Sequence, residues 1–260
     1  MVHTDPPGKE APGAIALEFG LDRLYDILLF DVGYTLVYFE PVQELVVQQA
    51  LRTLGVDRTV EAISSAAEQV WGTYYGNAET DTFPATQDYD RHTQAKLEAA
   101  LLAQLEVGGD EDALASYSAA IETRFSSPGA IRPYPEVFEF LTLLQAKGYR
   151  LGIVSNWSWN LKERVAQAGL DHFFEVIWAS AYAGCNKPHP GIFYSALKQL
   201  SPPATSSDRI LYVGDSFRHD VIGAWNAGIE AVLLDRSGTA SAADCPVIPD
   251  LWGLLDLLTP

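Results

Sequence analysis

The stretch that decides the fold is residues 27–36, which read ILLFDVGYTL. Its first four residues are apolar and predict a short strand that is buried on both faces of a parallel sheet. Asp31 follows directly, and a carboxylate stays among such neighbours only if it is paired or bound to a metal. Ligands of open α/β sheets bind outside the carboxyl ends of the strands, which makes Asp31 a candidate catalytic residue. The alternative is a strand that simply ends in a turn at Gly33.

Composition limits the classes of partner. The chain has 260 residues, of which 48% are hydrophobic and 11% aromatic, enough to build a well-packed core. Its 17 Lys and Arg residues face 34 Asp and Glu residues, so the net charge is -17. Without a cluster of basic residues, this charge disfavours binding to nucleic acid or to an anionic membrane. A small anionic substrate would need a local cationic site.

The cysteines and the chain start indicate a compartment. Cys185 and Cys245 are the only cysteines and form no CxxC pair, so a disulfide framework or a thiolate zinc site is not expected. The chain start lacks the pattern of a signal peptide, and no apolar run reaches the roughly 18 residues of a membrane span. We therefore expect a cytoplasmic protein in a reducing environment.

Two kinds of sequence pattern divide the chain. Residues 1–20 begin with a stretch rich in Pro, Gly and charge and predict a flexible N-terminal tail. Residues 39–130 carry apolar positions at helical spacing without a strand signal, which predicts a small helical bundle. In residues 21–38 and 131–260, short apolar runs alternate with helical patterns. This alternation predicts an α/β fold with a parallel sheet and crossover helices.

Polar residues follow two of the other predicted elements. Ser155 and Asn156 end the run LGIVS, where a hydroxyl and a backbone N–H could hold a phosphate oxygen or could merely cap a helix. Lys187 lies in a loop beside Pro188 and Pro190. It could neutralise both a carboxylate and a bound phosphate, or it could be a surface lysine in a stiff turn.

A pair of carboxylates follows the apolar run ILYV. Asp215 could bind Mg²⁺, a hard cation that prefers oxygen ligands. Asp220 could orient the waters of that metal or Lys187, or it could only cap the next helix. Arg218 and His219, which lie between the two carboxylates, are predicted to face solvent.

Four motifs occur in a fixed order, with h for an apolar residue and x for any residue. They are hhhhDxGxT, hhhS ending at Ser155, KPxPxIF starting at Lys187, and hhhhGDSxxxD ending at Asp220, with the helical insert after the first. Together they resemble the haloacid dehalogenase-like hydrolase superfamily, over the chain from about Tyr25 to its end. The resemblance implies a Rossmann-like core and a helical cap domain, residues 39–130, that closes over the site and selects the substrate.

The resemblance also implies a set of roles. Asp31 would be the nucleophile and a metal ligand, Ser155 would bind the transferred group, and Lys187 would compensate negative charge. The other Mg²⁺ ligands would be Asp215, Asp220 and the Gly33 carbonyl. The implied reaction is phosphoryl transfer: Asp31 attacks phosphorus and forms an aspartyl phosphate, which water then hydrolyses. The expected activity is that of a Mg²⁺-dependent phosphatase that acts as a monomer or homodimer on a small phosphorylated metabolite.

One position departs from the family pattern. Phosphatases of this family usually carry a second Asp, in DxDxT, that protonates the leaving group, whereas here that position is Gly33 and Tyr34 follows it. General acid–base catalysis contributes about 10²–10⁴-fold. Two alternatives therefore stay open, a carbon–halogen hydrolase and a non-catalytic binding protein. Dehalogenases of the family need no metal and place Tyr two residues after the nucleophile, so the intact GDSxxxD motif argues against the first alternative.

Several residues are candidates for substrate contacts. Thr35 and Asn156 belong to the motifs, and Arg91 and His92 could bind an anionic substrate. Aromatic residues of the helical insert are further candidates: Trp71, Tyr74, Tyr75, Phe83 and Tyr89. The helical spacing of Trp71, Tyr74 and Tyr75 favours core packing for these three. Trp157 and Trp159 follow Ser155 closely and could line the mouth of the pocket.

Overall fold

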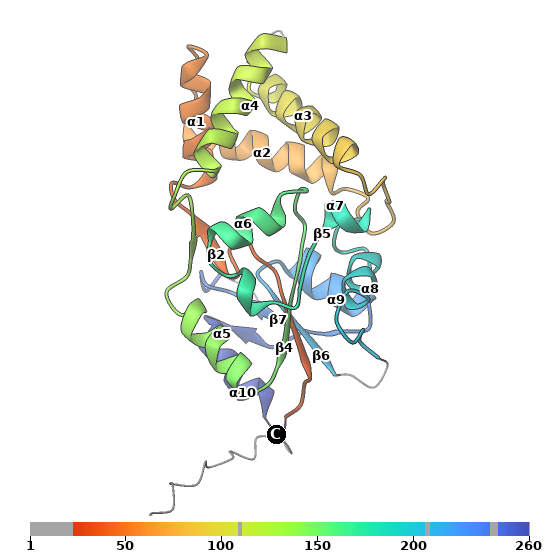
Figure 1. The fold of residues 1–260 in the computed structure, drawn as a ribbon. Helices are drawn as coiled ribbons and strands as arrows, with labels where there is room; N and C mark the ends of the chain where they lie inside the picture. Colours follow the sequence, from red (N-terminus) through yellow and green to blue (C-terminus); the bar gives the residue numbers. More distant parts are fainter. Residues whose placement is uncertain (1–22, 109–110, 206–208, 240–243, 260) are drawn as a thin grey trace, which may run out of the picture.

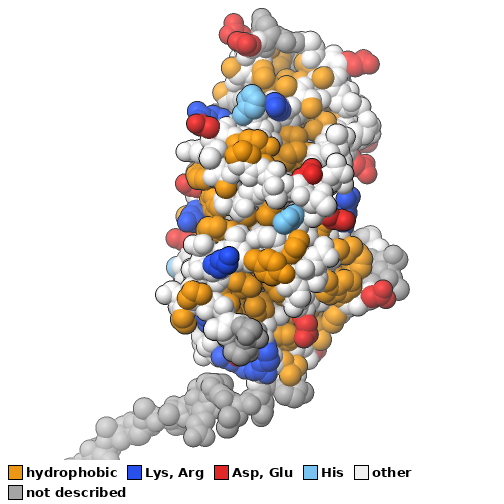
Figure 2. Space-filling view, turned by 90° about the vertical axis from the view of Figure 1, so that its right-hand side faces the viewer, with side chains coloured by type: hydrophobic (Ala, Val, Ile, Leu, Met, Phe, Trp, Pro, Cys, Tyr) orange, Lys and Arg blue, Asp and Glu red, His pale blue; other side chains and the backbone are white. Residues whose placement is uncertain are grey.

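The computed structural model describes residues 23–108, 111–205, 209–239 and 244–259, and the predicted tail lies outside these ranges. The described chain forms an α/β body with a segment of four helices above it (Figure 1). Within the described ranges, no helix is both long enough and apolar enough to cross a membrane. On the face seen in Figure 2, the Lys and Arg side chains over the helical segment are scattered and form no basic patch.

Strand β1 (Ile27–Phe30) lies inside a six-stranded sheet in which every neighbouring pair is parallel. The strand order is β5-β4-β1-β6-β7-β8, so β1 has β4 on one side and β6 on the other. The predicted parallel sheet is therefore confirmed, while the short edge strand β8 was not predicted. The other strands are β4 (Arg150–Ser155), β5 (Val176–Ala179), β6 (Ile210–Gly214), β7 (Glu230–Leu234) and β8 (Val247–Ile248).

Both faces of β1 are buried. All four of its side chains are fully enclosed, with Leu28 and Phe30 in one hydrophobic cluster and Ile27 and Leu29 in another. The alternation follows from the two-residue period of a strand. Helices cover each face (Figure 1): α5 (Val137–Ala146), α6 (Leu161–Gln167) and α10 (Leu255–Leu258) belong to the first cluster, and α8 (Gly191–Leu197) and α9 (Ile222–Asn226) to the second.

The helical segment has a core of its own, which includes Leu51, Ile63 and Tyr117. Its helices are α1 (Gln43–Thr53), α2 (Val60–Tyr74), α3 (Gln87–Gln104) and α4 (Glu111–Phe125). Helix α3 begins after Thr86, whose hydroxyl accepts the backbone N–H of Tyr89 and caps the helix.

A short antiparallel pair that was not predicted joins the two parts of the molecule. Strand β2 (Val37–Phe39) pairs with β3 (Ile131–Pro133), so both connections to the helical segment are tied together at its base. The remaining elements are single turns, namely 3₁₀ turns at Asp171–Phe173 and Leu251–Leu254, a π turn at Phe217–Val221 and α7 (Ser180–Ala183).

Adding a methyl group at two glycines should change stability in opposite directions. A Cβ on Gly152 in β4 would lie 2.7 Å from Leu29 Cδ2 and 2.7 Å from Val176 Cγ1, so we expect Gly152→Ala to lower the free energy of unfolding by about 1–3 kcal/mol. Gly72 in α2 has no atom within 4 Å of that position, and Gly72→Ala should stabilise by about 0.5–1 kcal/mol. Urea denaturation measures both values, and a Gly152→Ala variant as stable as wild type would contradict the packing of the sheet.

Candidate active site

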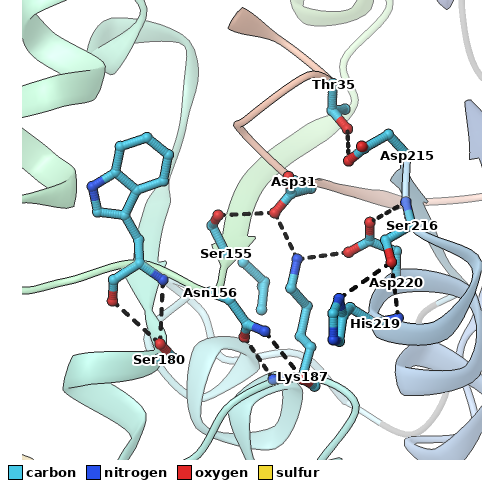
Figure 3. Close-up of polar contacts among 12 residues, drawn as sticks. Asp31, Thr35, Ser155, Asn156, Ser180, Lys187, Asp215, Ser216, His219 and Asp220 are labelled. Atoms are coloured by element: carbon cyan, nitrogen blue, oxygen red, sulfur yellow. Dashed lines mark hydrogen bonds and ion pairs between the residues drawn. The ribbon is translucent and has the colours of Figure 1, made fainter. Parts of the chain in front are cut away.

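Residues from four segments meet at the carboxyl edge of the sheet (Figure 3). Asp31 follows β1, Ser155 ends β4, Asp215 follows β6, and Lys187 comes from the loop between α7 and α8. They line a cavity of about 300 Å³ together with Gly33 and other residues. Because parallel strands end at the same edge, separate strand ends converge there, as expected from the sequence.

Lys187 lies at the centre of this cluster. Its Nζ donates hydrogen bonds to Asp31 Oδ1 at 2.6 Å, to Asp220 Oδ1 at 2.6 Å and to the Tyr212 hydroxyl at 2.8 Å. The side chain is 2% exposed, so the alternative of a surface lysine is wrong. Tyr212, which also donates to the Val154 carbonyl at 2.7 Å, was missed because its position inside a strand suggested only core packing.

Electrostatics keep Lys187 charged. Burial by itself would lower the pKa of Lys187, but the carboxylates of Asp220 and Asp31 outweigh this effect and raise the pKa. Burial raises the pKa of Asp31, while the ammonium of Lys187 opposes this by stabilising the carboxylate. Lys187 is therefore a permanent cation that lets two carboxylates share a buried site.

Neighbouring polar groups hold this arrangement in place. The Ser155 hydroxyl donates to Asp31 Oδ1 at 2.8 Å. The Asn156 side chain accepts the backbone N–H of Lys187 at 2.6 Å and donates to its carbonyl at 3.1 Å, so Asn156 fixes the loop that carries the lysine. Thr35 is fully buried, and its hydroxyl donates to Asp215 Oδ1 at 3.4 Å. Its expected substrate contact is not found, because Thr35 does not line the cavity.

His219 lines the cavity, contrary to the expectation that it faces solvent. The π turn at Phe217–Val221 directs the ring inward, where its Nδ1 lies 3.2 Å from Ser216 Oγ and its Nε2 is buried without a partner in the described structure. The ring also packs against Tyr75 of the helical segment, with 5.1 Å between ring centres. A π turn has no clear sequence signature, so this inward direction was not predictable.

The donor set fits a hard divalent cation. Carboxylate oxygens of Asp31, Asp215 and Asp220 lie within 4.8 Å of one another, and Gly33 lines the same cavity. Although Asp215 opens to the cavity, the partial enclosure of its carboxylate, together with the charges of Asp31 and Asp220, raises its pKa to about 8. Three carboxylates against one lysine leave negative charge that a cation such as Mg²⁺ would neutralise.

Arg91 and His92 are not at either cavity, which corrects the expectation that they contact substrate. Both are exposed, and Arg91 pairs with Asp88 on the outer side of α3. The helix turns its other side inward, where Asp90, Thr93, Gln94 and Leu97 line a second cavity of about 490 Å³. Helical periodicity places these four residues on one face, but packing alone decides which face turns inward.

The second cavity lies between the helical segment and the core. It shares Phe39, Gln43, Tyr75, Asn156 and Trp157 with the smaller cavity, so the two adjoin. Its walls include five aromatic residues of the insert, Trp71, Tyr74, Tyr75, Phe83 and Tyr89. Core packing was therefore the wrong prediction for Trp71, Tyr74 and Tyr75. Trp157 lines both cavities, whereas Trp159 uses its backbone N–H to bind Asp90 Oδ2 at 2.9 Å.

Comparisons with known proteins agree with this geometry. A family model described as haloacid dehalogenase-like hydrolase matches residues 56–234. A phosphoserine phosphatase from Thermus thermophilus is 28% identical over 226 residues, which cover 81% of this chain and 88% of that protein. YfnB from Bacillus subtilis, solved bound to magnesium, superposes on this chain with a TM-score of 0.69 at 22% identity. The superposition covers 90% of this chain and 98% of the YfnB chain.

Another relative matches only in part. A glyceraldehyde 3-phosphate phosphatase from Methanothermobacter thermautotrophicus is 33% identical over 140 residues, which cover 49% of this chain and 59% of that protein. The chain spans 59% of this protein's length, and 55% and 42% of the length of the same kind of phosphatase from Methanopyrus kandleri and Pyrococcus abyssi.

The buried lysine should be essential for the stability of the protein without added metal. Lys187→Met leaves Asp31 and Asp220 without their cation, and we expect a loss of about 3–5 kcal/mol in the free energy of unfolding. The loss should be smaller at pH 6 than at pH 8, because protonation of a carboxylate relieves the repulsion. The matched control is Lys198→Met at an exposed position, where we expect a change within about 0.5 kcal/mol. Equal stability of the two variants would contradict the role of the lysine.

Proposed function

This chain belongs to the haloacid dehalogenase-like hydrolase family, and on this basis we propose that it is a Mg²⁺-dependent phosphatase that uses Asp31 as its nucleophile. The observation that carries the proposal is the asymmetry of the Asp31 carboxylate. Its Oδ1 accepts hydrogen bonds from Ser155 and Lys187, whereas Oδ2 accepts none from the described residues. One oxygen therefore fixes the carboxylate, and the other is available to attack a phosphorus atom.

The reaction proceeds in two displacements. Asp31 Oδ2 attacks phosphorus in line, the bond to the ester oxygen breaks, and the leaving oxygen takes a proton from water to form the alcohol. Water then attacks the phosphorus of the aspartyl phosphate, which releases inorganic phosphate and restores Asp31. The Ser155 hydroxyl and the Asn156 backbone N–H, where β4 ends, bind the transferred phosphoryl group, and Lys187 stabilises the negative charge that both steps carry.

Asp31, Asp215 and the Gly33 carbonyl would hold the metal ion, which when bound screens the repulsion between carboxylate and phosphate. Asp220 already uses Oδ1 for Lys187 and Oδ2 for the backbone N–H of Ser216 at 2.9 Å. We therefore assign it to positioning the lysine and the metal's waters. Residues 39–130 would form a cap domain over a core built from residues 21–38 and 131–260.

A metal-free haloacid hydrolase fits the site less well. The carboxylate of a haloacid would enter a cavity that already holds Asp31, Asp215 and Asp220, and Lys187 is the only Lys or Arg among the described lining residues. That lysine already compensates Asp31 and Asp220. The substrate anion would therefore lack a cation to bind.

Removing the nucleophile tests the proposal directly. Asp31→Asn keeps the shape of the side chain but replaces the attacking oxygen by an amide, so we expect kcat for p-nitrophenyl phosphate to fall below about 0.1% of wild type. The matched control is Asp26→Asn, one residue before the same strand, where the carboxylate pairs with Arg23 and Arg209 far from the cavity. Substantial turnover by a clean Asp31→Asn preparation would exclude the covalent mechanism.

Metal binding has a readout that does not depend on turnover. We expect millimolar Mg²⁺ to raise the melting temperature, because the carboxylate cluster exists only in the folded protein. Asp215→Ala should abolish this shift, whereas Asp256→Ala, which removes an exposed carboxylate of α10, should keep it. A wild-type melting temperature that does not respond to Mg²⁺ would show that the metal assignment is wrong.

Gly33 offers room for the acid that the family pattern lacks. A Cβ there would meet only Trp157 at 3.7 Å and Phe39 at 3.9 Å, and the positive φ belongs to Tyr34 at 57°, not to Gly33. We expect Gly33→Asp to speed hydrolysis of alkyl phosphates by up to roughly 10²-fold, with a smaller gain for p-nitrophenyl phosphate, whose leaving group scarcely needs a proton.

Gly33→Ala is the control for this substitution, since it adds the Cβ without the carboxyl group. It should give no selective gain. A folded Gly33→Asp variant with unchanged alkyl-phosphate turnover would mean that another group in the site already supplies the proton.

A further inference from the structure

The larger cavity adjoins the catalytic one and has room for a sizeable leaving group. Its volume is about 490 Å³, within the range of sites that enclose a drug-sized molecule. Tyr75 and Trp157 line both cavities, so a phosphate ester with its phosphorus beside Asp31 would extend its alcohol part between them. The chemistry of this second cavity therefore selects the alcohol.

Aromatic faces form one part of its wall. Trp71 and Tyr75 stack with 5.9 Å between ring centres and 22° between planes, and Tyr74 lies edge-on to Tyr75 at 4.9 Å. Phe83 and Tyr89 form a second stack with 5.4 Å between ring centres and 9° between planes. Such surfaces bind flat apolar groups, and the negative potential over each ring face also attracts organic cations.

Carboxylates form the other part of the wall. Glu44, Asp90, Glu98 and Glu122 all line the cavity, and Arg164 is the only Lys or Arg among the described lining residues. Both oxygens of Glu122 accept hydrogen bonds from Arg164 Nη2 at 2.8 Å, which neutralises this guanidinium.

The other three acidic residues lack a basic partner in the described part of the chain. Asp90 accepts the backbone N–H of Trp159 at 2.9 Å, and Glu98 accepts the hydroxyl of Ser118. Burial raises the pKa of both carboxyl groups, as expected for acids enclosed without a cation. A ligand with a positive charge would relieve this cost, and a ligand with a second anionic group would increase it.

We propose that the substrate is a phosphate monoester of a large alcohol that carries a flat apolar body and a positively charged amine, quaternary ammonium or heteroaromatic cation. The phosphate would lie beside Lys187 and the cation between the aromatic stacks and Asp90. The assignment of the phosphate end rests on the proposed phosphatase function. The preference for a cation follows from the second cavity alone and can be tested without turnover.

Binding of three probes that differ in charge tests the cavity. Benzyltrimethylammonium, benzyl alcohol and phenylacetate share one ring, and the fluorescence of Trp71 and Trp157 in the wall can report their binding. We expect the cation to bind at least about tenfold more tightly than phenylacetate. Equal binding of the three probes, or tighter binding of phenylacetate, would overturn the proposal.

Two variants of α3 locate the effect. Asp90→Asn removes the charge and keeps an oxygen for the Trp159 N–H, and it should weaken binding of the cation about tenfold relative to benzyl alcohol. Asp88→Asn removes a carboxylate that is 89% exposed and pairs with Arg91 outside the cavity, so it should leave the preference unchanged. An equal response of the two variants would show that the preference reflects net charge and not the cavity.

Turnover separates this inference from the proposed function. With p-nitrophenyl phosphate as the reference, we expect thiamine monophosphate, an ester with a heteroaromatic cation, to have a kcat/KM at least about tenfold above those of phosphoserine and phosphoglycolate, which carry carboxylates. Preference for the acidic esters would overturn the substrate class and leave the phosphatase function intact. If no ester is hydrolysed, the phosphatase function fails, and the probe series alone decides whether the cavity selects cations.

Discussion

The site depends on one buried ammonium group. Lys187 Nζ lies 2.6 Å from Asp31 and 2.6 Å from Asp220, and without it two enclosed carboxylates would face each other uncompensated. Asn156 fixes the backbone on which the lysine sits, and Tyr212 occupies its third donor. Because Lys187 and Ser155 both bind Oδ1 of Asp31, Oδ2 has no donor among the described residues. The contact with Lys187 thus stabilises the buried charges and leaves one oxygen of the nucleophile unbound.

The sheet explains why residues so distant in sequence meet. Asp31, Ser155 and Asp215 each follow or end an apolar run, and each run is a strand that is parallel to its neighbour in the order β4-β1-β6. The apolar run and the polar residue at its end can both be read from a short stretch of sequence. Because parallel strands share one carboxyl edge, the polar residues of neighbouring strands are then expected in one site. For this reason the fold class and the positions of the motif residues could be predicted from the sequence.

Other parts of the site could not be predicted, because they depend on how elements turn toward one another. Arg91 and Asp90 are adjacent on α3, yet the first is exposed and the second lines a cavity. His219 turns inward through a π turn, and Tyr212 reaches Lys187 from the middle of a strand. Periodicity shows which residues share a face, but only packing between the helical segment and the core decides which face meets the cavity.

The central claim is that the phosphoryl group passes through Asp31 before it reaches water. The most direct measurement is the stereochemical course of hydrolysis of a phosphorothioate ester, whose phosphorus is made chiral by sulfur and two oxygen isotopes, in water that carries the third isotope. Each in-line displacement inverts the configuration at phosphorus, so two displacements restore it. The account predicts inorganic thiophosphate with retained configuration, and inversion would contradict it, because a single attack by water would then suffice.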